Sequence, residues 1–270
     1  MSDEVILYSV SDGIAQVTLN RPAKMNALNP EMIVRLAKAW DEINADPSIR
    51  VAVLTGAGER TFCAGADLGR LIPLFTRARG AEDEWDEAML ADPKILNRAM
   101  LRRTDFATPV IGAFRGTVVA GGMELALGCD LRVVADDSTL GLLEVKRGLI
   151  PAAGGVARVS RQISWAMAAE ILLVGDKMSA QEALRVGLVN RVVPGDQVLP
   201  TAYALARQMA KNSPLAMRAA KEVMIACSGR TINEAFDAED ASIKKLMRSE
   251  DAKEGSRAFM EKREPRFTGR

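Results

Sequence analysis

Three short apolar runs constrain the fold of this chain more than any other feature. Val, Ile, Leu and Ala dominate them: VAVLTG (51–56), VIGAF (110–114) and LRVVAD (131–136). Uninterrupted β-branched runs are typical of parallel strands that are buried on both faces. After each run a glycine-rich turn leads towards a helical pattern, and repeated strand–helix units of this kind predict an α/β fold. With 270 residues, the chain is long enough for one sizeable core.

The N-terminal part adds two strands and a helix to this pattern. VILYSV (5–10) and IAQVTLN (14–20) flank a Ser-Asp-Gly turn, which predicts two adjacent strands joined as in a hairpin. Asn29 followed by Pro30 provides an N-cap and a first-turn residue, and apolar side chains then recur at helical spacing. We therefore expect an amphipathic helix over residues 30–45.

The rest of the chain is mainly helical. Residues 70–98 are more charged and less periodic, which indicates a helical excursion that covers a pocket. After residue 157 the pattern predicts one short strand, GLVNRVV (187–193), among helices near 162–173, 179–186, 198–212, 214–227, 231–247 and 250–262. The expected organisation is a core of residues 1–195 followed by a helical C-terminal subdomain of residues 196–270.

Composition excludes several classes of function. There is no histidine, so His-based nucleophile systems, His-ligated metal sites and a histidine general base are all ruled out. Cys63, Cys129 and Cys227 are widely spaced, which favours reduced thiols over a disulfide framework or a zinc site. A net charge of +1 argues against nucleic-acid and membrane-surface partners. No run is long enough for a membrane span and the first residues lack a signal-peptide pattern, so a cytoplasmic location is expected.

One acid stands out within an apolar, glycine-rich stretch. Glu124 lies in AGGMELALGCD (120–130), where an ionised carboxylate is costly to remove from water without a partner. Two interpretations fit this residue alone: a hydrogen-bonded structural acid, or a catalytic acid or base. A second acid, Glu144 in EVKRG, is also compatible with a position at the exposed end of a strand.

Two glycine-rich loops are candidates for binding through the main chain. GAGERTFCAGAD (56–67) has Thr61 at the third glycine position of a dinucleotide fingerprint and lacks the GK[ST] of a phosphate-binding loop. Its small residues Ala64, Gly65 and Ala66 would instead let a ligand approach main-chain N–H groups. Gly121 follows a strand and precedes a helix, where N–H groups also point outwards. Converging loops of this kind would form an oxyanion hole, whereas each loop alone is also explained by close packing.

Several motifs together resemble the crotonase, or enoyl-CoA hydratase/isomerase, superfamily over essentially the whole chain. They are NRPAKMNALN (20–29), FCAGADL (62–68), GGMELALGCDLRVVADD (121–137), EVKRGLIPAAGG (144–155), MSAQEALRVGLVNRVV (178–193) and the C-terminal SEDAKEGSRAFMEKREPRFTGR (249–270). The resemblance implies a spiral of repeated ββα units, with the helical C-terminal subdomain mediating oligomerisation and covering the coenzyme A site. It also implies self-association to a trimer or a dimer of trimers.

The resemblance assigns roles to four residues. The N–H groups of Ala66 and Gly121 would hold the thioester oxygen of an acyl-CoA, while Glu124 would activate water and Glu144 would deliver a proton. Hydration of a conjugated thioester needs three catalytic contributions: stabilisation of the enolate, activation of water at Cβ and protonation at Cα. Two acids that repel each other and are partly buried can hold different protonation states, although their titrations are then coupled.

The coenzyme A part of the substrate would be bound by residues that match the family's motifs. They are Ala23, Lys24, Ala64, Asp67 and Leu68, together with Phe259 and Lys262, which would reach the coenzyme A of a neighbouring subunit. No metal and no cofactor beyond this substrate is implied. The chain also departs from the family pattern, with Gly69-Arg70 where many hydratases carry Lys-Glu and Ala152 where a glycine is common.

The expected activity is hydration of a 2-enoyl-CoA. A carnitinyl-CoA dehydratase-like enzyme suits the paired glutamates and the C-terminal motif as well, and an acid in the acyl pocket would favour it. An enoyl-CoA isomerase, working with Glu144 alone, is a third alternative. A non-catalytic acyl-CoA-binding or RNA-associated protein is disfavoured, because both acids are kept and the charge is balanced.

Overall fold

The computed structural model describes residues 4–270, and its strands form two sheets. The larger sheet has the order β1-β2-β3-β5-β7-β10, and all neighbours are parallel except the antiparallel pair β1–β2. Its strands are β1 (Ile6–Ser11), β2 (Ile14–Leu19), β3 (Val51–Gly56), β5 (Val110–Phe114), β7 (Leu131–Ala135) and β10 (Arg191–Val193). The predicted strands at both ends of the Ser-Asp-Gly turn and the three apolar runs are thus confirmed.

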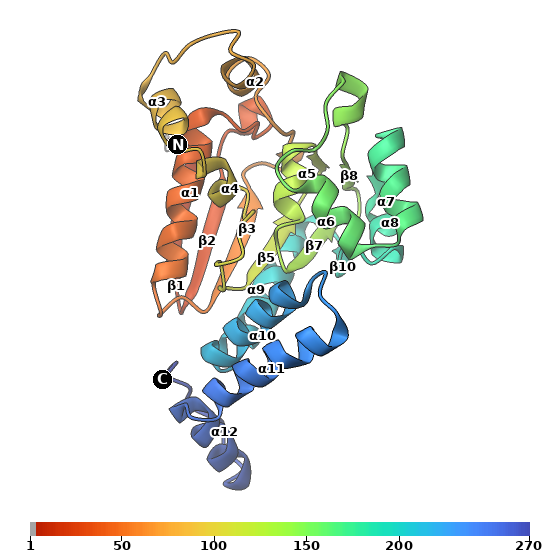
Figure 1. The fold of residues 1–270 in the computed structure, drawn as a ribbon. Helices are drawn as coiled ribbons and strands as arrows, with labels where there is room; N and C mark the ends of the chain where they lie inside the picture. The colour runs from red at the N-terminus through yellow and green to blue at the C-terminus, as the bar shows by residue number, and fades with distance from the viewer. Residues whose placement is uncertain (1–3) are drawn as a thin grey trace.

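The smaller sheet consists of strands that the sequence does not reveal. Its order is β4-β6-β8-β9, with β4 (Thr61–Cys63), β6 (Thr117–Val119), β8 (Thr139–Gly141) and β9 (Met178–Ser179). The pairs β3–β4, β5–β6 and β7–β8 are consecutive in the chain, and each pair contributes one strand to each sheet in the same order. Each turn of the chain therefore adds a ββ unit followed by helix, which is the expected ββα spiral (Figure 1).

Helices cover both faces of the larger sheet. On one face, α9 (Val198–Ala210) packs Val198, Ala202 and Ala206 against side chains of β3, β5 and β7. The opposite face packs against α1 (Pro30–Ala45) and the rest of the core. Alternate residues of β3 serve the two faces, because Val51 and Val53 lie in the α9 cluster and Ala52 and Leu54 in the other. Burial on both faces explains why the first four residues of this strand are all apolar.

The segment between β4 and β5 is helical, as expected, and runs from the top of Figure 1 down along α1. It contains α2 (Leu71–Phe75), α3 (Glu84–Ala91) and α4 (Ile95–Ala99), and α3 and α4 contact α1. After β6 comes α5 (Gly121–Ala126). The chain then continues through η2 (Glu144–Arg147), α6 (Gly155–Gln162), α7 (Trp165–Ala169), the π-helical η3 (Glu170–Val174), α8 (Ala180–Arg185) and η4 (Gly195–Gln197).

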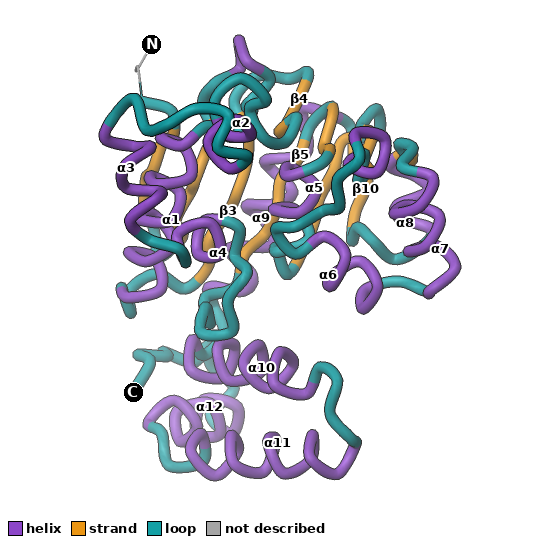
Figure 2. Tube along the Cα trace, turned by 45° about the horizontal axis from the view of Figure 1, so that its top comes forward, coloured by secondary structure: helices purple, strands orange, loops and turns teal. Residues whose placement is uncertain are grey.

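The last three helices, α10 (Pro214–Cys227), α11 (Ile232–Leu246) and α12 (Glu250–Met260), lie together and apart from the strands (Figure 2). Lys221 of α10 forms a 2.8 Å ion pair with Asp130 and so attaches this group to the core. α9, which begins after residue 195, packs on the larger sheet and does not lie with these three helices. The division of the chain into a core and a C-terminal subdomain at residue 195 stays a prediction. Among residues 4–270, every helix is too short or too polar to cross a lipid bilayer.

Candidate active site

Glu124 is buried at the start of α5 and is held by the first turn of another helix. Its side chain is 5% exposed, and its Oε1 accepts the N–H groups of Ala153 at 2.6 Å and Gly155 at 2.9 Å. These donors lie at the beginning of α6, where helical N–H groups have no partner within the helix. The carboxylate therefore caps α6, and the helix start in turn fixes the position of the carboxylate.

The pKa of Glu124 is raised from its ordinary value of 4.5 to about 7, chiefly by burial and in part by the negative charge of Glu144. The N–H groups of Gly155 and Ala153 act in the opposite direction because they stabilise the ionised form. A carboxyl that titrates near neutral pH can accept and return a proton under physiological conditions. The environment thus suits Glu124 to acid–base chemistry.

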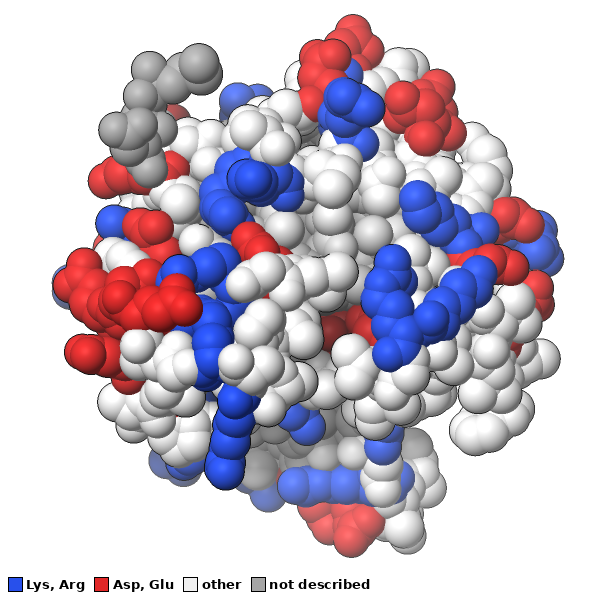
Figure 3. All heavy atoms as spheres, turned by 90° about the horizontal axis from the view of Figure 1, so that it is seen from above, with Lys and Arg blue, Asp and Glu red and all other residues white. Residues whose placement is uncertain are grey.

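Glu144 follows β8 and opens the 3₁₀ helix η2. Its pKa is raised chiefly by burial, although the side chain is only partly enclosed. Its Oε2 is buried and has no hydrogen-bond partner within residues 4–270. An unpaired buried oxygen favours the protonated acid, since the neutral form costs less to desolvate. Figure 3, which views the molecule from above, shows acidic atoms recessed in the middle of this face beside Lys and Arg side chains.

The main-chain nitrogens of Ala66 and Gly121 lie where the two glycine-rich loops approach each other. A Cβ built on Gly121 would lie 3.5 Å from the Ala66 nitrogen, and one built on Gly65 would lie 3.1 Å from the Gly121 nitrogen. Strand-like pairing with Leu28 fixes the first loop, because Leu28 donates to the Gly65 carbonyl and receives the N–H of Asp67, each at 2.8 Å. Within the described chain, the N–H groups of Ala66 and Gly121 have no acceptor. They are available to a ligand oxygen.

Gly65 must be glycine for this arrangement. Its φ is +95°, a conformation that L side chains rarely adopt. A Cβ at this position would also lie only 2.7 Å from the Cβ of Ala120, the residue that joins β6 to α5. The two loops therefore approach more closely than any other residue at position 65 would allow.

The residues expected to bind coenzyme A fall into two groups. Ala23 and Lys24 are exposed in the 3₁₀ helix η1 (Pro22–Lys24), and the neighbouring Met25 carbonyl accepts the N–H of Ala64 at 3.0 Å. Leu68 is exposed beside the same loop, so the structure brings residues 23–24 and 64–68 together. Their contact with coenzyme A stays a prediction.

Asp67 has structural partners of its own. Its Oδ2 pairs with Arg21 at 3.2 Å, and its Oδ1 accepts the N–H of Gly69 at 3.0 Å. Phe259 and Lys262 lie in and just after α12, at the opposite end of the molecule from α5 (Figure 1). Within one protomer they are therefore not part of the site.

Sequence reasoning assigned no role to Ala153 and Gly155, which hold Glu124. The available signal was the Gly154-Gly155 pair before a helical pattern, where free N–H groups point away from the helix. In the described part of the chain, no three His, Cys, Asp or Glu side chains gather as a metal ion would require.

The fold and the site define a class: a two-sheet ββα spiral that carries two interacting glutamates, at least partly buried, and two unpaired N–H groups from adjacent loops. The chain belongs to the enoyl-CoA hydratase/isomerase family, whose model matches residues 9–270. It is similar to the (E)-benzylidenesuccinyl-CoA hydratase of Thauera aromatica, with 36% identity over 98% of this chain and 99% of the relative. The carnitinyl-CoA dehydratase of Proteus mirabilis is 37% identical over 95% of each chain. A crystal structure of enoyl-CoA hydratase from Bacillus anthracis matches with a TM-score of 0.88 and 34% identity, covering 99% of this chain and 100% of the other.

Proposed function

We propose that this protein is an enoyl-CoA hydratase that adds water across the Cα=Cβ bond of a 2-enoyl-CoA. The observation that carries the proposal is the combination of two partly or fully buried glutamates, each with a raised pKa, and two N–H groups without acceptors in the described chain. Relatives named as enoyl-CoA hydratases and as carnitinyl-CoA dehydratases support the same class of reaction.

The thioester oxygen would accept the N–H groups of Ala66 and Gly121. Negative charge grows on this oxygen as water adds to Cβ, and fixed donors stabilise that charge without having to reorganise. Their stabilisation is greatest in the enolate-like transition state, so it lowers the barrier and does not merely tighten binding. The reaction as proposed uses no metal and no cofactor, because coenzyme A belongs to the substrate.

The environments of the two glutamates support different roles. The two N–H groups that Glu124 accepts oppose the effect of burial on its pKa, so its carboxylate is available near neutral pH and takes a proton from the attacking water. Glu144 has an unpartnered buried oxygen, which favours its acid form, so it gives a proton to Cα. The water oxygen bonds to Cβ, the Cα=Cβ π bond breaks, and one water is added overall. Solvent exchange then restores both protonation states.

The acid pair gives a direct test by substitution. Glu124→Gln and Glu144→Gln should each lower kcat by roughly 10²–10⁴-fold while affinity for coenzyme A changes little, as expected for a positioned acid or base. Glu170→Gln, on an exposed helix, is the matched control and should retain activity. The assay follows the absorbance of the enoyl thioester of crotonyl-CoA. Near-native turnover of both active-site variants would contradict the proposal.

The acyl group is best identified by a panel of substrates. The panel should include 2-enoyl-CoAs of increasing chain length together with crotonobetainyl-CoA, because carnitinyl-CoA dehydratases are among the relatives. The hydratase proposal predicts the highest kcat/KM on an uncharged enoyl chain. A clear preference for crotonobetainyl-CoA would favour the dehydratase alternative.

We further propose that the protein assembles into a trimer or a dimer of trimers, with Phe259 and Lys262 reaching the coenzyme A of an adjacent subunit. Phe259 is 83% exposed, and large apolar side chains are exposed across the last three helices, including Met224, Ile232, Phe236, Ile243, Met247 and Met260. Extensive exposed apolar surface commonly marks a protein interface. Lys262→Ala should raise KM for coenzyme A substrates more than it lowers kcat. A fully active monomer in light scattering would contradict this arrangement.

A further inference from the structure

A fully buried carboxylate organises the segment between β4 and β5. Asp86 of α3 has no exposed surface, and Arg79 binds it with both guanidinium Nη atoms, one of them at 2.8 Å from Oδ1. The N–H of Glu82 donates to its Oδ2 at 3.0 Å, and Arg70 approaches the same oxygen at 3.3 Å. A buried charge needs such a set of partners, so these contacts fix the segment in one arrangement.

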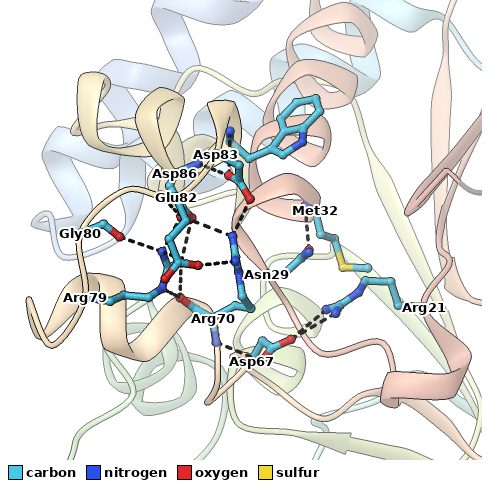
Figure 4. A network of polar contacts seen from close by, with 11 residues as sticks. Arg21, Asn29, Met32, Asp67, Arg70, Arg79, Gly80, Glu82, Asp83 and Asp86 are labelled. Carbon is cyan, nitrogen blue, oxygen red and sulfur yellow. Dashed lines mark hydrogen bonds and ion pairs between the residues drawn. The ribbon is translucent and has the colours of Figure 1, made fainter.

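Arg70 is the point at which this cluster meets the glycine-rich loop. Its guanidinium pairs with Glu82 at 2.7 Å and with Asp83, in addition to Asp86. Its main chain contacts both sides, because the N–H donates to Asp67 Oδ1 at 3.2 Å and the carbonyl accepts Arg79 Nη2 at 2.7 Å. Figure 4 shows Arg70 between Asp67 on one side and the acidic residues of the cluster on the other.

Asp67 in turn is the residue directly after Ala66, one of the two proposed oxyanion donors. The turn from 67 to 70 is held at its near end by Arg21, which pairs with Asp67 at 3.2 Å, and by Leu28, whose carbonyl accepts the Asp67 N–H. Its far end is held by the side chain of Arg70. A shift of this turn would be passed to the Ala66 N–H through the Ala66 Cα, which joins the peptide unit shared with Asp67 to the preceding unit that carries this N–H.

We propose that Arg70 is a positioning residue that keeps the Ala66 N–H aimed at the thioester oxygen by tying residues 67–70 to the Asp86 cluster. The proposal rests on the proposed hydratase function. Its physical basis is that a displacement of about 1 Å at a reacting centre can cost up to about 10²-fold in rate.

A control residue in the same segment distinguishes a positioning role of Arg70 from a purely structural one. Arg98 of α4 pairs with Asp41 at 3.0 Å and with Asp92 at 2.7 Å, and its side chain is 30% exposed against 35% for Arg70. It stabilises the same excursion by ion pairs but makes no hydrogen bond or ion pair with residues 66–70. Removal of either arginine weakens the segment, whereas only removal of Arg70 releases the turn.

The test compares Arg70→Ala with Arg98→Ala on crotonyl-CoA, whose short acyl group limits effects from contacts along a chain. We expect Arg70→Ala to lower kcat about 10-fold with less than about a 3-fold change in KM, and Arg98→Ala to change kcat less than about 2-fold. Arg70→Lys should fall between wild type and Arg70→Ala, because a single ammonium group cannot replace a planar fork that binds several carboxylates. Arg70→Lys also takes the place of Arg70→Ala in this comparison if the alanine variant no longer unfolds cooperatively.

A second measurement is independent of turnover. Hydrogen–deuterium exchange of the free protein should show faster exchange at the amides of residues 67–71 in Arg70→Ala and not in Arg98→Ala, since the Gly69 and Arg70 N–H groups bond to Asp67. Equal exchange and equal kcat in the two variants would overturn the proposal, as would a loss confined to KM. If the wild type hydrates no 2-enoyl-CoA of the panel, the proposed function fails, and exchange alone then decides whether Arg70 holds the turn.

Discussion

Replacement of Glu124 by glutamine should stabilise the fold in a pH-dependent way. The pKa of Glu124 is about 7 in the folded protein against an ordinary 4.5, so the fold prefers the neutral acid. The preference of the fold for neutral Glu124 contributes to the free energy of unfolding. This contribution is fully present below pH 4.5 and is lost as the pH rises through about 7, because the pKa is raised in the folded protein. The glutamine side chain of the variant carries no charge at any pH and would therefore escape this loss.

The magnitude follows from the two pKa values. At pH 8 ionised Glu124 costs the fold about 3 kcal/mol relative to the unfolded chain, whereas at pH 5 the cost is about 1 kcal/mol. The difference in free energy of unfolding between Glu124→Gln and wild type should thus grow by about 2 kcal/mol from pH 5 to pH 8. The amide oxygen of the glutamine can still accept the N–H groups of Ala153 and Gly155. Any change in the strength of these bonds shifts the stability difference by the same amount at both pH values.

Urea unfolding at fixed protein concentration measures this difference, because self-association would otherwise alter the apparent stability. Glu170→Gln, at an exposed position, is the control, and its difference from wild type should change by less than about 0.5 kcal/mol between the same pH values. A stability difference for Glu124→Gln that is constant with pH, or that shrinks as pH rises, would refute the reasoning.

Three further predictions concern the neighbourhood of the site and the C-terminal segment. Once Glu144 ionises, its charge raises the pKa of Glu124, and Glu144→Gln removes that charge, so ¹³C NMR of labelled glutamate should show Glu124 titrating at lower pH; an unchanged midpoint would mean that the two acids do not interact. Gly122→Ala would place a Cβ 2.4 Å from the Cys63 carbonyl oxygen, and we expect a loss of at least about 2 kcal/mol in urea unfolding, so full stability would show that this contact is not tight. The buried Asp251 carboxylate accepts the Ser213 hydroxyl and the main-chain N–H groups of Thr268 and Gly269 in the C-terminal segment. Asp251→Asn should cost about 1–3 kcal/mol and speed proteolysis after residue 260; unaltered proteolysis would argue against this anchoring.

Elements with local signals were predicted well. The helix expected over residues 30–45 is α1, Pro30–Ala45, and the Asn29 side chain accepts the N–H of Met32 at 3.0 Å as its cap. The runs at 51–56 and 110–114 are β3 and β5 with the same bounds. In these cases the cap, the helical spacing and the apolar run lie within the element itself, so the sequence alone carries the information.

Elements that depend on distant contacts were not predicted. The helix expected near 162–173 is present as α7 and the π-helical η3 that continues it, whereas α6 (Gly155–Gln162) was not predicted. The start of α6 depends on Glu124, whose carboxylate lies about thirty residues earlier and accepts the helix's first N–H groups. The smaller sheet was missed for a similar reason, because its strands have two or three residues and form only by pairing between turns of the spiral.

For the site as well, the sequence identifies the residues but not the environment of their side chains. Motif resemblance selects Glu124, Glu144, Ala66 and Gly121, and the structure places the N–H groups of the last two next to each other. What the sequence does not contain is the degree of burial, and this is what raises the pKa of Glu124. The Asp86 cluster is likewise invisible in sequence, where its residues resemble an ordinary solvated charge run.

Hydration in isotopically labelled water tests the central proposal most directly. The protein is incubated with crotonyl-CoA in H₂¹⁸O or in D₂O, and the product is examined by mass spectrometry and NMR. We predict a 3-hydroxyacyl-CoA that carries one ¹⁸O at Cβ or one deuterium at Cα, with formation lowered at least about 10²-fold in Glu124→Gln and in Glu144→Gln. Release of free coenzyme A, a shifted double bond without oxygen incorporation, or equal labelling by the variants would contradict hydration by this pair of glutamates.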